Sequence, residues 1–176
     1  MMTGHVPTTL LGIALVLAMP LAAPLAAQSA PTPACALLST SEIRQATGIQ
    51  EYGTGSNGDQ EGEGMGGGSS CQWDAASFVG KGAPLLSLVL IRGKGYTERM
   101  RDGKPTPGCK QEPVSGVGDL AFFESCRTDS SRTPPLFVKV GSNDLLLQMD
   151  VEPPTTVAAA RALVVNVAKA AVAKLR

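Results

Sequence analysis

Four cysteines constrain the fold of this chain more than any other feature of its sequence. They stand at positions 35, 71, 109 and 126, no two of them in a C-x-x-C spacing, and the one histidine, His5, lies near the start. A zinc site therefore lacks both its usual ligand spacing and an imidazole to complete it. An even number of cysteines instead favours two structural disulfides, provided that the chain folds in an oxidising compartment.

The first 27 residues predict export to such a compartment. The apolar run LLGIALVLAMPLAAPLAA ends in small residues, which is typical of a signal peptide cleaved after Ala27. Pro20 and Pro24 interrupt the run and disfavour a permanent membrane span, although a retained amino-terminal anchor is the alternative. The residues before Cys35 do not form a lipobox, so this thiol stays available for a disulfide. We expect a secreted or periplasmic protein with no stable membrane span after cleavage.

Four cysteines allow three pairings, and the sequence alone leaves the choice open. We favour the sequential pairs Cys35–Cys71 and Cys109–Cys126, each closing a loop of moderate length and contributing about 3–4 kcal/mol through loop-closure entropy. The Cys35–Cys71 bond would tie the two ends of the Gly-rich stretch at 51–70 to the domain. We therefore expect a single disulfide-stapled domain over residues 35–176, preceded by a Pro-rich leader at 28–34.

Helices are predicted near the two ends of this domain. STSEIRQATG begins with a capping box formed by Ser39 and Glu42 and stops at Gly48, which suits a left-handed helix end. So short a helix does not persist alone in water, and a disulfide at the preceding cysteine would hold its start in place. The closing segment, capped by Thr155 or Thr156, is longer and carries an apolar stripe. The stripe consists of Val157, Ala160, Val164, Val167, Ala171 and Leu175.

Strand patterns fill the region between these helices. CQWDAASF alternates, PLLSLVLI is apolar on both faces as in a central strand, EPVSGVGDLAFFES contains two strands around a turn, and LFVKVGSNDLLLQMDV predicts a hairpin. Residues 51–70 contain eight glycines and no basic residue, so we expect a disordered loop there. The order predicts an α+β domain with an antiparallel five- or six-stranded sheet, the N-terminal short helix and the long C-terminal helix packed on one face.

One segment carries a local excess of positive charge. Residues 92–110 hold six basic and two acidic side chains around a predicted short helix at 96–102, whereas the formal charge of the chain is zero. The overall balance argues against nucleic-acid binding. A basic run is more often a solvated face, yet it offers contacts to an anionic ligand or acidic partner, and tyrosines add recognition surface. The candidate contact residues are Tyr52, Tyr96, Arg92, Lys94, Arg99 and Arg101.

Catalysis is constrained by the missing imidazole, because Ser-His-Asp and Cys-His mechanisms need it as a base. A carboxylate pair can work without histidine, and Glu112, Asp119 and Glu124 are its candidates. Asp119 follows Gly-Val-Gly, so we expect it to stabilise a turn by accepting nearby backbone N–H groups. The acids between positions 57 and 63 lack EF-hand spacing, and we expect no metal or other cofactor.

The order of these motifs carries a family resemblance. CALLSTSEIRQATG, a Gly-rich spacer, CQW, EPVSGVGDLAFF, LFVKVGSNDLLLQM and an Ala/Val-rich helix follow one another over about residues 34–175. This order is similar to small secreted domains and lipoproteins of unknown function from high-GC bacteria, and resembles the extracellular sensor domains of some bacterial Ser/Thr kinases. The resemblance implies an α+β sheet domain, a Cys35–Cys71 bond and a ligand- or partner-binding role. It implies no known catalytic residue. The chain departs from these groups in lacking a lipobox cysteine and a preceding kinase or transmembrane segment, so we expect no direct signalling through a membrane.

We therefore expect an exported, non-catalytic binding or sensor-like domain of the cell envelope that binds an envelope ligand or protein partner. The alternatives are a carboxylate-dependent hydrolase acting on envelope sugars and a structural or inhibitory partner protein. The fold separates the first two, because convergent acids in a cleft favour the enzyme and a neutral or apolar cleft favours binding.

Overall fold

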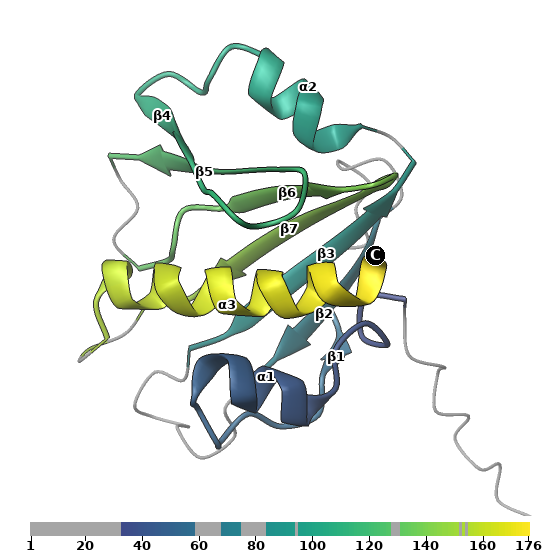
Figure 1. The fold of residues 1–176 in the computed structure, drawn as a ribbon. Coiled ribbons are helices and arrows are strands. Elements are labelled where there is room, and N and C mark those ends of the chain that lie inside the picture. The colour runs from purple at the N-terminus through teal and green to yellow at the C-terminus, as the bar shows by residue number, and fades with distance from the viewer. Residues whose placement is uncertain are drawn as a thin grey trace, which may run out of the picture.

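The chain folds into one antiparallel sheet with helices against it (Figure 1). The computed structural model describes residues 33–58, 68–74, 84–93, 95–127, 131–151, 153 and 155–176. In chain order the elements are α1 (Thr40–Thr47), β1 (Ser56–Asn57), β2 (Ser69–Trp73), β3 (Leu86–Arg92), α2 (Tyr96–Asp102), β4 (Cys109–Pro113), β5 (Leu120–Cys126), β6 (Leu136–Val140), β7 (Asn143–Met149) and α3 (Val157–Leu175). The α+β class is confirmed. The predicted signal peptide lies outside the described residues.

The sheet has seven strands within the described part of the chain, in the order β1-β2-β3-β7-β6-β5-β4. Every neighbouring pair is antiparallel, as predicted. The apolar segment predicted to be central forms β3, which pairs with β2 on one side and β7 on the other. The prediction of five or six strands was wrong because it did not include β1.

The additional strand comes from the Gly-rich segment that we expected to be disordered. Residues 51–58 and 68–70 instead have defined places in the fold, while residues 59–67 lie outside the described ranges. A Cβ at Gly55 would approach Trp73 Nε1 to 2.6 Å and Cys71 Sγ to 2.7 Å, so glycine lets this backbone lie directly against the disulfide. The next two residues then pair with β2. Tertiary contact produces this strand, since no local alternation encodes it.

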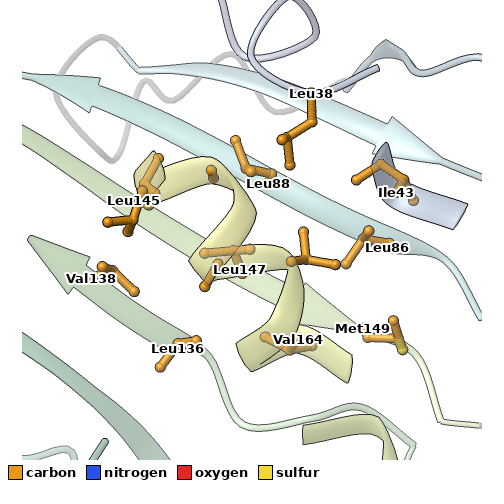
Figure 2. Packing of buried hydrophobic residues seen from close by; sticks show 14 of the residues in the cluster. Leu38, Ile43, Leu86, Leu88, Leu136, Val138, Leu145, Leu147, Met149 and Val164 are labelled. Carbon is orange, nitrogen blue, oxygen red and sulfur yellow. The ribbon is translucent and has the colours of Figure 1, made fainter. Parts of the chain in front are cut away.

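The helices α1 and α3 lie on the same face of the sheet, as predicted (Figure 1). Figure 2 shows side chains of β3, β6 and β7 meeting those of both helices. The labelled side chains of these elements are Ile43, Leu86, Leu88, Leu136, Val138, Leu145, Leu147, Met149 and Val164, and Leu38, just before α1, joins them. Alanines at positions 160, 168 and 171 are fully buried, so small residues bring α3 close to the sheet. No helix in the described part of the chain has the length and apolar character needed to cross a membrane.

Both disulfides join the predicted sequential pairs. Cys35–Cys71 connects the segment before α1 to β2, and Cys109–Cys126 links two directly paired positions of β4 and β5. All four cysteines are described, and none is free. Two disulfides are typical of a chain that folds in an oxidising compartment.

The capping box of α1 is confirmed and also connects this helix to α3. The backbone N–H of Ser39 donates to Glu42 Oε2 at 2.9 Å, and the N–H of Glu42 donates to Ser39 Oγ at 3.3 Å. Gly48 ends the helix in the left-handed region, at φ 74°. Lys174 Nζ lies 2.7 Å from Glu42 Oε1, so one carboxylate both caps α1 and holds it against the end of α3.

Glu42→Gln is expected to lower the free energy of unfolding by about 1 kcal/mol at pH 7, a modest value because the ion pair is partly exposed to solvent. The Lys174 ammonium and the Ser39 hydrogen bonds lower the pKa of Glu42 from 4.5 to about 2. Because the folded pKa lies below the unfolded one, this stability is fully present above about pH 4.5 and is lost as the pH falls to about 2.

Urea unfolding at pH 7 and near pH 2 measures this effect. Glu51→Gln, at an exposed glutamate beyond the helix, is the matched control and should be near neutral. An equal loss from Glu42→Gln at both pH values would contradict the assignment.

Candidate functional site

The sheet presents a second face, away from α1 and α3, which we call the open face. Successive strand residues point to opposite sides, so the neighbours of the core residues lie on it. Ser87 and Val89 alternate with the core leucines of β3, and Leu146 and Gln148 alternate with those of β7. This face therefore carries hydroxyl and amide groups as well as apolar ones.

The helix α2 covers one part of the open face, over β6 and β7. Its first backbone N–H groups, of Tyr96 and Thr97, donate to the carboxylate of Asp144 at 2.8 and 2.9 Å. The Tyr96 ring packs on Phe137, with centroids 6.1 Å apart, and Phe137 stacks on Phe122 at 5.1 Å. In Figure 1, α2 lies at the end of the sheet opposite α1. An aromatic cluster thus fills this part of the face.

The rest of the open face, over β2, β3 and β7, is hollowed to a volume of about 140 Å³. We call this cavity the hollow. Its lining consists of Ser70, Gln72, Leu85, Ser87, Val89, Arg132, Leu146, Gln148 and Asp150. Val89 and Leu146, which are register partners, provide an apolar floor between polar groups.

Hydrogen bonds hold the polar lining of the hollow in place. Ser87 Oγ donates to the backbone oxygen of Gln148 at 3.4 Å, and Gln148 Nε2 donates to the backbone oxygen of Thr133 at 3.2 Å. At the rim, Arg132 Nε donates to Asp150 Oδ1 at 2.8 Å. Asp150 is the only acid among the described lining residues, and this guanidinium neutralises it. The site is therefore suited to hydrogen bonding with an uncharged ligand.

The expectation that Tyr52 is a surface contact was wrong. Its side chain is fully buried, and its hydroxyl donates to the backbone oxygen of Pro84 at 2.9 Å. Arg44 explains this position, because Nε and Nη2 donate to the Tyr52 backbone oxygen at 2.9 and 2.6 Å and draw the segment onto α1. Burial raises the pKa of the Tyr52 hydroxyl.

Among the other predicted contact residues, the four that the structure describes do not line the hollow. Tyr96 is half-buried, its pKa is raised by burial, and the Arg99 guanidinium lies 5.8 Å from its ring centroid. Arg92 is exposed at the end of β3. Arg101 is exposed and paired with the neighbouring Asp102 at 2.7 Å. Lys94 lies outside the described residues.

The predicted carboxylate candidates do not converge. Glu112 lies 2.8 Å from Lys110 Nζ and 2.6 Å from Arg161 Nη2, and these cations lower its pKa to about 2, which makes it a poor proton donor near neutral pH. Glu124 pairs with Gln111, and Glu112 occupies the next register position, so the two glutamates lie on opposite faces of the sheet. Glu124 is buried on its face. These two acids therefore cannot act together on one bond.

Asp119 has the structural role that we expected, but with a different partner. Its Oδ2 accepts the backbone N–H of Gly141 at 2.7 Å, so it holds the β6–β7 hairpin to the turn before β5. The described residues contain no group of three or more side chains suited to hold a metal ion. The acids at 59, 61 and 63 lie outside those residues.

Sequence reasoning missed the hollow although it left one usable signal. Ser87 and Gln148 are polar positions within otherwise apolar strand segments, and the structure makes them register partners. Because directly opposite residues of an antiparallel pair point to the same face, the two side chains place polar groups together on the open face. The pairing of β3 with β7 was needed to see it.

No protein-family profile matches the chain, and comparisons with curated proteins and with solved structures likewise find no match.

Proposed function

We propose that this protein is an exported, non-catalytic binding or sensor-like domain of the cell envelope, and that the hollow is its ligand site. The observation that carries the proposal is the neutral character of the hollow, where hydroxyl and amide groups surround an apolar floor. Binding sites typically combine a concave apolar surface with a few polar groups that orient the ligand.

The position of the hollow also supports binding. Its floor lies on β3 and β7, two interior strands of the sheet, and the opposite side of these strands belongs to the hydrophobic core formed with α1 and α3. Polar groups on such strands keep their geometry without a ligand, so little ordering entropy is lost on association. A site of this kind gains affinity from being formed in advance.

Export is supported by the predicted signal peptide at residues 1–27 and by the two disulfides. The resemblance to secreted and sensor domains points the same way. The alternative, a carboxylate-dependent hydrolase, needs two acids about one bond, whereas Asp150 is paired with Arg132 and the other candidate acids lie apart.

Thermal-shift screening of the processed chain tests the proposal, with envelope sugars, lipids, peptides and inorganic anions as probes. At a hundredfold excess over its Kd, a hollow ligand should raise Tm by about 5–10 °C. Ser87→Trp, which fills the hollow, should remove this shift, whereas Arg99→Glu on α2 should leave it unchanged. A shift that survives Ser87→Trp and disappears in Arg99→Glu would assign binding to the basic run instead.

A further inference from the structure

The internal hydrogen bonds of the hollow decide which polar groups remain for a ligand. A hydroxyl carries one proton, and Ser87 donates its proton to the backbone oxygen of Gln148. Its oxygen therefore faces a ligand as an acceptor.

The amide of Gln148 is oriented in a similar way. Its nitrogen donates one hydrogen to the backbone oxygen of Thr133, in the segment before β6, and this leaves the amide oxygen and one amide N–H for a ligand. An amide oxygen has two lone pairs and accepts hydrogen bonds only. Ser87 and Gln148 are register partners, so two acceptors lie side by side on neighbouring strands.

The rim offers a complementary arrangement. The Arg132–Asp150 bond joins Nε to Oδ1, which leaves the second carboxylate oxygen as an acceptor and the terminal guanidinium N–H groups as donors. Two adjacent hydroxyl groups match this arrangement, because each hydroxyl both donates and accepts. An anion would meet the carboxylate, and a cation would meet the guanidinium, so neither sign of charge is favoured.

The floor and the size of the hollow limit the ligand further. Val89 and Leu146 present aliphatic surface, which suits the C–H face of a saturated ring. A volume of about 140 Å³ suits a single small unit rather than a long chain. Acceptors on two strands, a donor–acceptor rim and an aliphatic floor together describe the surface of a monosaccharide.

We infer that the hollow binds a polyol of monosaccharide size and recognises it by accepting hydrogen bonds from its free hydroxyl groups. This inference rests on the proposed function of the hollow and adds the chemical class of the ligand. It assigns Asp150 and Gln148 as specificity-determining residues, with Ser87 as a third acceptor.

Saturation-transfer NMR on the processed chain tests the class. The probes are D-glucose, D-galactose, D-mannose and N-acetyl-D-glucosamine, each beside its fully O-methylated derivative, together with inorganic phosphate. At least one free sugar should bind, and its O-methylated derivative should bind at least tenfold more weakly because it has lost the hydroxyl donors. Ser87→Trp should abolish the signal.

Asp150→Asn should weaken the sugar about tenfold, because a charged acceptor becomes a neutral one. Asp102→Asn is the matched control, since Asp102 also pairs with an arginine at 2.7 Å but lies on α2, away from the hollow. Unfolding in urea should show both variants folded.

Equal binding of a sugar and its O-methylated derivative would overturn the inference. Phosphate binding that Ser87→Trp removes, without sugar binding, would overturn it too but leave the hollow as a ligand site. If none of the probes gives a signal that Ser87→Trp removes, both the inference and the proposed function are rejected.

Discussion

Replacing Cys35 and Cys71 together by alanine is expected to lower the free energy of unfolding by about 4 kcal/mol, a large share of a small domain's stability. The two cysteines are 36 residues apart in sequence, so their bond removes much loop freedom from the unfolded chain. Cys71 is also fully buried beside the core, and alanine leaves its sulfur's space empty.

The same bond holds the first buried part of the domain. Ala34 and Leu38 are buried in the core, and the Ala34 N–H donates to Ser69 Oγ at 3.1 Å. Without the disulfide, this segment must be held by those contacts and by the short helix α1 alone. We therefore expect faster hydrogen exchange in the α1 amides of the variant than in any other helix.

The second disulfide provides the matched control for this measurement. Cys109 and Cys126 are only 17 residues apart and lie at a sheet edge, so their replacement by alanine should cost about 3 kcal/mol. Urea unfolding of both double variants gives the comparison. A larger loss from the second pair would show that the core contacts of Cys71 contribute less than we infer.

Asp144→Ala is expected to lower the free energy of unfolding by about 3 kcal/mol and to release α2 from the sheet. The carboxylate is fully buried and accepts the first two N–H groups of α2, whose own N-cap, Gly95, provides no side-chain bond. Alanine would leave the buried N–H of Thr97 and the partly buried N–H of Tyr96 without a partner, which costs more than losing the bonds alone. Asp144 thus caps a helix from a distant strand.

Asp119→Ala is the matched control for this prediction. Asp119 also accepts a backbone N–H, from Gly141 at 2.7 Å, but it is exposed, so water can replace it. We expect a loss of about 1 kcal/mol or less there, and an intermediate loss for Asp144→Asn, which keeps one acceptor. Urea unfolding and α2 hydrogen exchange measure both effects. Equal losses from Asp144→Ala and Asp119→Ala would contradict the capping of α2 by Asp144.

Local sequence was sufficient for the elements whose stabilising bonds span a few residues. The capping box of α1, the glycine that ends it and the threonine cap of α3 are all as predicted, with Thr156 as the cap. The apolar stripe of α3 and the apolar β3 segment also identified core positions correctly. Each of these features depends on neighbours within one helical turn or on alternation along one strand.

Residues that depend on distant partners could not be placed from the sequence. Tyr52 stands at the start of a Gly-rich segment, as surface residues often do, yet Arg44 and Pro84 hold it in the interior. Ser87 and Gln148 are 61 residues apart, and only the pairing of β3 with β7 brings them into one hollow. The seven-strand order likewise arises from long-range contacts.

The sequence by itself therefore determined the α+β class, the helix boundaries and the absence of an imidazole in the predicted mature chain. Only the tertiary structure decided which strands meet, which face stays open to a ligand and which polar side chains share it. The physical reason is the range of the interactions: caps and periodicity act between near neighbours, whereas strand register is set by burial and hydrogen bonds between segments far apart in the chain.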